Sequence, residues 1–184
     1  MFSLKKVLLG GIVLFSTVFF SGCANKVLTY SPNTMNVMQL KNMEINKGKT
    51  DTFTDSGREE TKVMCRLATP VGTPSGETFA SYIKDAFTQE LMLADKYDSK
   101  SSNVLSANID DLYGSTTIGN AYWEFKLTMK SSNGSSYKVE SRYDYESSFS
   151  ALSACSEMQR SFVPAVQKLN KDIINNPKFP DLLK

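Results

Sequence analysis

The 184-residue sequence contains no histidine. Without an imidazole, the Ser-His-Asp and Cys-His relays of common hydrolases are excluded, and so are metal sites built on histidine. Ser-Lys and paired-carboxylate chemistry remain possible, and the adjacent acid pairs are Glu59-Glu60 and Asp110-Asp111. Neighbours on a strand point to opposite faces, so neither pair is expected to converge on one substrate. We therefore predict a protein that is not an enzyme, with no catalytic residue, metal ligand or cofactor.

The chain also lacks an excess of charge of either sign. It has 21 basic and 19 acidic residues, a net charge of +2, and the two signs are mixed along the chain. Nucleic-acid binding normally needs a clustered positive face, so no nucleic-acid partner is expected. Long apolar runs are scarce too. The one at residues 7–20 is shorter than the roughly 20 residues that a membrane-spanning helix needs.

This short apolar run has informative flanks. Lys5 and Lys6 precede it, and the residues Phe20-Ser21-Gly22-Cys23 end it. A basic start, an apolar middle and small residues at the end are typical of a secretory signal peptide. The segment resembles the lipobox of bacterial lipoproteins, with Phe20 where that family usually has Leu. A plain cleaved signal and an uncleaved anchor are the alternatives.

The lipobox resemblance implies cleavage before Cys23 and attachment of three acyl chains, palmitate among them, to that residue. Several acyl chains anchor a protein stably, whereas one binds only marginally. The next residue is Ala24 rather than Asp. By analogy with enterobacterial lipoproteins, this implies an outer-membrane protein held on the periplasmic side. Loss of Lys5 and Lys6 with the signal would bring the net charge from +2 to zero.

Export and acylation of Cys23 would leave Cys65 and Cys155 as one pair in an oxidising compartment. We predict a disulfide between them. The alternative is a reactive or metal-binding thiol, but a zinc site would require further Cys or His ligands.

The chain divides into a signal peptide at residues 1–22, a lipidated tether at 23–36 and a single domain at 37–184. The patterns predict strands at residues 37–45, 62–67, 104–112, 121–130 and 137–145, of which the fourth alternates most clearly. The intervening segments 47–60, 70–76 and 114–120 are predicted to be loops. Asn133-Gly134 predicts a hairpin turn between the last two strands.

Two helices are predicted, at residues 77–94 and 149–175. Each has an apolar stripe at spacings of three and four. The first stripe comprises Phe79, Tyr82, Ile83, Ala86, Phe87, Leu91 and Ala94, and the second comprises Cys155, Met158, Phe162, Val166, Leu169 and Ile173. Pro164 lies within the second helix and predicts a kink or a restart there. The tail with Phe179, Leu182 and Leu183 is expected to pack back on the domain.

These elements predict an α+β domain, with a mostly antiparallel sheet of about five strands and two helices on one of its faces. The element order, the anchor and the run from Arg66 to Tyr97 resemble small periplasmic lipoproteins of the ABC-transport auxiliary kind. We expect a non-enzymatic binding or assembly module of the cell envelope, with a membrane contact through its lipid and a protein partner. The alternatives are a carrier or sensor of a lipid or other apolar ligand, and a surface-exposed antigen or adhesin.

Overall fold

The computed structural model describes residues 25–56, 58–66, 69–74 and 76–184, and these form an α+β domain. The predicted signal peptide and Cys23 lie outside the described residues. None of the helices in the described ranges is long and apolar enough to span a bilayer.

The main sheet has four strands in the order β2-β5-β6-β7. They are β2 (Lys49–Thr54), β5 (Val104–Thr117), β6 (Asn120–Ser131) and β7 (Ser136–Tyr145). The last three are antiparallel neighbours, whereas β2 runs parallel to β5. Burial alternates along β6 and β7, because successive side chains point to opposite faces and only one face is covered.

A smaller sheet has the order β1-β4-β3. Its strands are β1 (Asn25–Lys26), β4 (Thr69–Gly72) and β3 (Lys62–Cys65). β3 and β4 are antiparallel, and β1 is parallel to β4. The expectation of one sheet of about five strands is therefore wrong in its detail, since two sheets are present and each contains a parallel pair.

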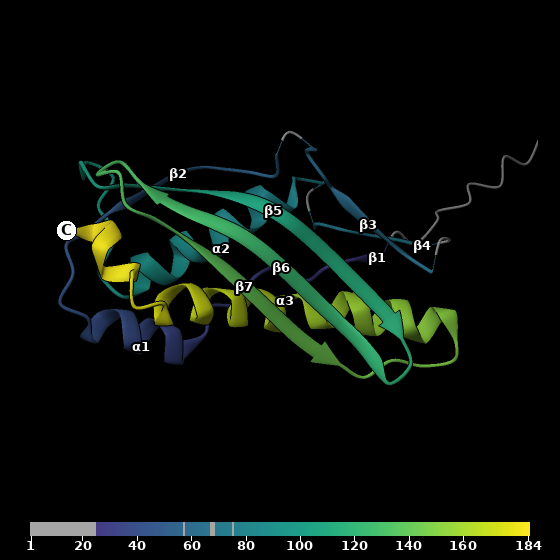
Figure 1. Cartoon of the computed structure of the whole chain (residues 1–184). Helices are drawn as coiled ribbons and strands as arrows, with labels where there is room; N and C mark the ends of the chain where they lie inside the picture. The colour runs from purple at the N-terminus through teal and green to yellow at the C-terminus, as the bar shows by residue number, and fades with distance from the viewer. Residues whose placement is uncertain (1–24, 57, 67–68, 75) are drawn as a thin grey trace, which may run out of the picture.

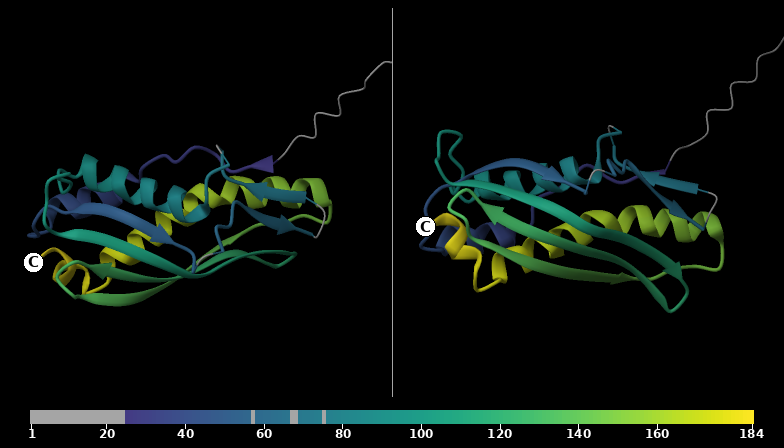
Figure 2. Two further views of the ribbon diagram at one scale, coloured as in Figure 1. Left: turned by 90° about the horizontal axis from the view of Figure 1, so that it is seen from above. Right: turned by 45° about the horizontal axis from the view of Figure 1, so that its top comes forward.

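The helices are α1 (Thr34–Asn42), α2 (Phe79–Leu93) and α3 (Ala151–Asn175), followed by the 3-10 helix η1 (Phe179–Leu183). α2 and α3 cover one face of the main sheet, and the other face is open (Figures 1 and 2). α1, the helix that the sequence did not predict, packs against α2 and α3. α3 continues through Pro164 without ending, so the predicted restart is absent.

Both predicted apolar stripes are buried, and so are the three apolar residues of the tail. The core is rich in aromatic rings. The Trp123 ring lies 4.9 Å from that of Phe162, edge to face, and its indole N–H donates to the Met158 carbonyl and the Ser161 hydroxyl, both at 3.1 Å. The space between helices and sheet is thus occupied by packed side chains, with the polar edge of the indole satisfied.

Three of the predicted loops contain strand residues. The 47–60 segment contains β2, which pairs with β5 although its only apolar residue is Phe53. The Pro- and Gly-rich 70–76 segment begins with β4. The 114–120 segment is mostly the end of β5, which runs on to a tight turn at Gly119, where φ is +75°.

The N-terminal part of the domain differs most from the prediction. Residues 37–45 were expected to be a strand, and most of them belong to α1. Residues 25–36, expected to be a free tether, pack on the domain, since Val27 and Tyr30 are buried. The folded domain therefore includes residues 25–36, which precede the predicted boundary at residue 37.

The structure contains a disulfide between Cys65 at the end of β3 and Cys155 in the first turns of α3. Both residues are buried. The bond fixes the small sheet to the start of the long C-terminal helix, two elements that are 90 residues apart in the sequence.

Candidate functional site

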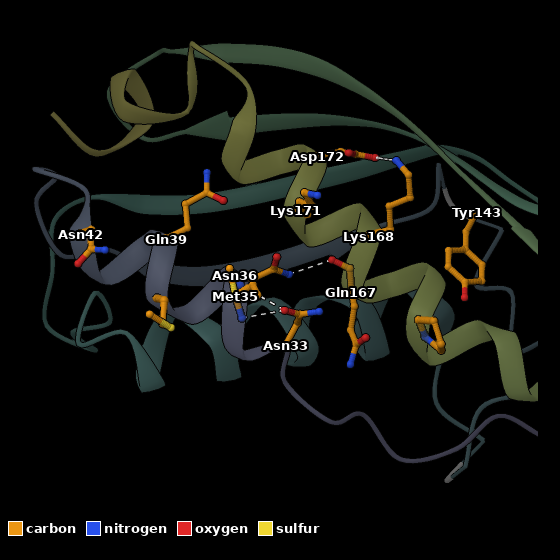
Figure 3. A pocket seen from close by; sticks show the side chains of 12 residues that line it. Asn33, Met35, Asn36, Gln39, Asn42, Tyr143, Gln167, Lys168, Lys171 and Asp172 are labelled. Carbon is orange, nitrogen blue, oxygen red and sulfur yellow. Dashed lines mark hydrogen bonds and ion pairs between the residues drawn. The ribbon is translucent and has the colours of Figure 1, made fainter.

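An open groove of about 670 Å³ lies between α1 and α3, and reaches the β7 residue Tyr143 (Figure 3). Amide side chains dominate its wall. The lining residues are Asn33, Met35, Asn36, Met38, Gln39, Asn42, Tyr143, Pro164, Gln167, Lys168, Lys171 and Asp172. Amides both donate and accept hydrogen bonds. The Asn36 amide is buried and bonded within the protein, so a bound peptide would meet the remaining donors and acceptors of Asn33, Gln39, Asn42 and Gln167.

The first wall of the groove is α1, whose start is set by Asn33. The Asn33 side chain caps the helix by accepting hydrogen bonds from the N–H groups of Met35 (2.9 Å) and Asn36 (3.3 Å). Asn36 and Leu40 then face the domain and are buried. Met35 and Met38 face outward, with 70% and 52% of their surfaces exposed. α1 therefore presents two flexible, polarisable side chains to solvent beside the groove.

α1 is held in place by Glu90, a fully buried residue of α2. The Glu90 carboxylate accepts hydrogen bonds from the Tyr30 hydroxyl (2.5 Å), the Asn33 backbone N–H (3.0 Å) and the Asn36 side-chain amide (3.2 Å). The Asn36 amide also donates to the carbonyl of Gln167 on α3 (2.9 Å). The segment before α1, α1 itself and both large helices are thus joined at one carboxylate.

Burial raises the pKa of the Glu90 carboxyl above its usual value, although hydrogen bonds from Tyr30, Asn33 and Asn36 act in the opposite direction. Burial and the neighbouring Glu90 carboxylate raise the pKa of the Tyr30 hydroxyl as well. Tyr30 therefore stays protonated and remains a hydrogen-bond donor. In turn, the Asn170 amide of α3 donates to the Tyr30 oxygen at 3.1 Å.

The second wall of the groove is the C-terminal half of α3. Pro164 lines it, and because proline has no N–H, the preceding turn of the helix lacks one backbone hydrogen bond. Further along, Lys168 donates to the Asp172 carboxylate at 2.6 Å, a pairing of residues four apart on one helix face. Asp172 is the one carboxylate among the lining residues, and it is paired with Lys168. The groove therefore offers hydrogen-bonding groups and no unpaired carboxylate that could act as a base.

The open edge of the main sheet, β7, lies next to the groove. The Ser131 N–H donates to the Ser135 carbonyl. With the regular antiparallel register, the N–H and C=O groups of the odd-numbered β7 residues therefore point toward β6, and those of the even-numbered residues point toward the open edge. The outward-facing side chains there alternate in charge and comprise Lys138, Glu140, Arg142 and Asp144. Alternating charges of this kind protect an edge strand from unspecific pairing.

The acid pairs from the sequence do not form a site. The N–H groups of Glu59 and Glu60 donate to the Asp55 carboxylate at 2.8 and 2.7 Å, so their backbones form a turn. Asp110 lies at a β-bulge and accepts a hydrogen bond from Thr128 (2.8 Å). Among the described residues, no group of three or more Cys, Asp or Glu could hold a metal ion.

The sequence interpretation missed Glu90 and the residues around it. A signal was present, since Glu90 lies seven residues after Ile83 and three after Phe87, on the apolar stripe of the helix. A single acid on a buried stripe indicates a paired or hydrogen-bonded carboxylate. Its partners could not be read from the sequence, because Tyr30 and Asn36 lie more than 50 residues away.

No protein-family model matches this chain, and no curated protein is similar to it in sequence. Among solved structures, a crystal structure of protein XCC0632 from Xanthomonas campestris, of the family DUF330, is similar in fold. Its TM-score is 0.52 and its sequence identity is 8%, over 81% of this chain and 93% of that chain. At this identity the similarity supports the α+β architecture and carries no function across.

Proposed function

We propose that the protein is a lipid-anchored, non-enzymatic module of the cell envelope, and that it binds a segment of a partner protein in the groove between α1 and α3. The observation that carries this proposal is the composition of the groove. It combines five amide side chains, of which only Asn36 is buried, with the exposed Met35 and Met38, and the α1 wall is fixed by the buried Glu90. Methionine-rich surfaces adapt to the side chains of a bound peptide.

The anchor is supported by the sequence. Lys5, Lys6, the apolar run and Cys23 give the layout of a lipoprotein signal. Cys23 lies two positions before Asn25, the first residue of β1. An acylated Cys23 would hold the domain close to the bilayer, at the outer membrane on its periplasmic side.

A carrier of apolar ligands is less well supported by the packing. A ligand between helices and sheet would displace fully buried rings, among them Trp123, Phe125 and Phe162. The groove, by contrast, is open, and most of its lining residues have polar side chains. These features favour binding of a polypeptide segment over enclosure of a lipid.

Site-specific photo-crosslinking in intact cells would test the groove. A photoreactive residue replaces Met38 in one variant and Met92 in the matched control. Both methionines are about half exposed, at 52% and 53%, and Met92 lies outside the groove. We expect an adduct with one envelope protein from position 38 and none from position 92.

The adduct alone does not establish the function. The partner, once purified, must bind the wild-type protein and lose affinity on Met38→Asp but not on Met92→Asp. Equal crosslinking from both positions, or none from position 38, would contradict the groove proposal. Mass analysis of the exported protein tests the anchor separately, because an unmodified Cys23 would contradict it.

A further inference from the structure

The start of α3 carries the two most exposed large apolar side chains of the described residues. Phe149 is 88% exposed and Leu152 is 78% exposed. From Ser147 to Ser156 the chain contains no charged residue. Single exposed apolar residues are common on protein surfaces, but two at these exposures in an uncharged stretch mark an interaction site.

Hydrogen bonds place a third exposed apolar residue at the same end of the molecule. The Arg66 guanidinium donates to the carbonyls of Phe149 (2.8 Å) and Thr116 (3.3 Å), so the start of α3 lies beside the end of β5. Ile118, two residues after Thr116, forms the β5–β6 turn and is 44% exposed. We refer to Ile118, Phe149 and Leu152 as the apolar tip.

The described chain begins at this same end. β1 runs parallel to β4, with Asn25 opposite Val71, and β4 in turn pairs Thr69 with Cys65. Following β1 back toward its first residue therefore leads toward Cys65, which directly precedes Arg66. Figures 1 and 2 show β1, β4, the start of α3 and the β5–β6 turn at one end of the domain.

We propose that the apolar tip inserts into the bilayer interface and fixes the orientation of the domain on the membrane. This inference depends on the acylation of Cys23 proposed above. Cys23 and Asn25 are two positions apart in the sequence, and two residue steps span at most about 7 Å. An acyl group on Cys23 would thus hold the apolar tip at the headgroup level, where exposed Phe, Leu and Ile side chains are stabilised by leaving water.

Contact with a bilayer explains the exposure of the apolar tip better than contact with a protein partner does. An anchor attached two positions before Asn25 would bring the bilayer close to the tip and leave little room there for another protein. The serines at 147, 148, 150 and 153 surround Phe149 and Leu152 with uncharged hydrogen-bonding groups. Such groups can remain among the headgroups without the cost of desolvating a charge.

The orientation has a consequence for the groove. Its α3 residues, Pro164 to Asp172, follow Leu152 by 12 to 20 positions on the same helix. At a rise of 1.5 Å per residue they lie about 18–30 Å from the tip along the helix axis. Insertion of the tip would therefore present the groove away from the bilayer, within reach of a partner in the periplasm.

Lipid quenching of tryptophan fluorescence tests the inference with the mature acylated protein. Phe149→Trp places a reporter on the tip. Leu93→Trp places the control at the end of α2, at a site 61% exposed. Each variant is reconstituted in phosphatidylethanolamine–phosphatidylglycerol vesicles with and without brominated phosphatidylcholine. Trp123 is fully buried and contributes the same background to both.

We expect a blue shift and loss of the added fluorescence for Phe149→Trp and no change for Leu93→Trp. Equal quenching of the two variants, or none at position 149 in protein that still floats with the vesicles, would overturn the inserted tip and leave the anchor intact. Protein that fails to float and lacks acyl mass on Cys23 would overturn the anchor and this inference together. The two failures are thus distinguishable.

Discussion

The Tyr30 hydroxyl lies 2.5 Å from a carboxylate oxygen of Glu90, 60 residues further along the chain. This contact attaches the N-terminal segment to α2, and the Asn33 and Asn36 contacts to the same carboxylate set the position of α1. One wall of the groove therefore depends on a single buried acid.

Glu90→Ala is expected to lower the free energy of unfolding by about 3 kcal/mol or more, because it leaves several buried donors without an acceptor. Tyr30→Phe removes one hydroxyl from the cluster and should cost about 1 kcal/mol. Urea denaturation followed by Trp123 fluorescence measures both. Similar losses for the two variants would show that the cluster does not depend on the carboxylate.

The Glu90 carboxyl also predicts a pH dependence of stability. Its pKa in the folded state is raised above the usual 4.5, mainly by burial. The unfolded chain then releases this proton at lower pH than the folded protein does. The contribution of Glu90 to stability is therefore fully present below pH 4.5 and is lost as the pH rises through the folded-state pKa.

Glu90→Gln cannot titrate at this position and provides the reference. We expect the wild-type unfolding free energy, relative to that of Glu90→Gln, to fall as the pH is raised from 4 toward neutrality. Urea unfolding at a series of pH values measures this difference. A difference that is constant, or that grows with pH, would be inconsistent with a raised pKa.

Asp55 is expected to show the opposite pH dependence. Burial acts to raise its pKa, but hydrogen bonds from the backbone N–H groups of Glu60 and Glu59 outweigh it, and the net pKa is lowered. Its contribution is present above the usual pKa of 3.8 and is lost as the pH falls through the folded-state value. Asp55→Asn should therefore destabilise the protein at neutral pH and make less difference in acid, as measured by urea unfolding.

Removal of the Cys65–Cys155 disulfide should be costly. The bond closes a loop of 90 residues, and the chain-entropy model assigns a loop of that length about 4–5 kcal/mol. The double variant Cys65→Ala/Cys155→Ala should lose about this much unfolding free energy in urea. If it unfolds at the same denaturant concentration as the oxidised wild type, the bond does not constrain the unfolded chain as expected.

Gly114 on β5 is predicted to accommodate a side chain only at a cost. A Cβ there would collide with the terminal methyl of Met158 and approach the Trp123 ring to 3.0 Å. Gly114→Ala should therefore cost about 1–3 kcal/mol through overpacking. Thermal unfolding measures the loss, and Ser136→Ala at the exposed start of β7 is the control. Equal midpoints for the two variants would show that the core adjusts freely.

Much of the fold can be predicted from the sequence, because the patterns that indicate its strands and helices involve residues close together in the chain. Alternation along β6 and the stripe from Phe79 to Ala94 identify a strand and a helix without knowledge of their partners. The tail with Phe179 is similar, since a short apolar cluster must be buried somewhere. Pairing of the two cysteines followed from the lipoprotein resemblance and their number.

The errors occur where a partner determines the local structure. β2 has one apolar residue and is a strand only because β5 offers it a parallel edge. β4 accommodates Pro70 between two strands because β1 pairs only with Val71 and Gly72. α1 buries one polar residue, Asn36, beside the apolar Leu40, so its amphipathic pattern is weak.

The sequence by itself determined the two long helices and the antiparallel hairpin of β6 and β7, because each is a pattern of near neighbours. The lipoprotein layout of the N-terminus is also a local pattern, and it stays a prediction. Only the tertiary structure decided that Tyr30, Asn36 and Glu90 meet, that a groove opens between α1 and α3, and that Phe149 lies at the same end of the domain as β1. These relationships join residues tens of positions apart, and a buried polar contact at that separation is fixed by packing rather than by periodicity.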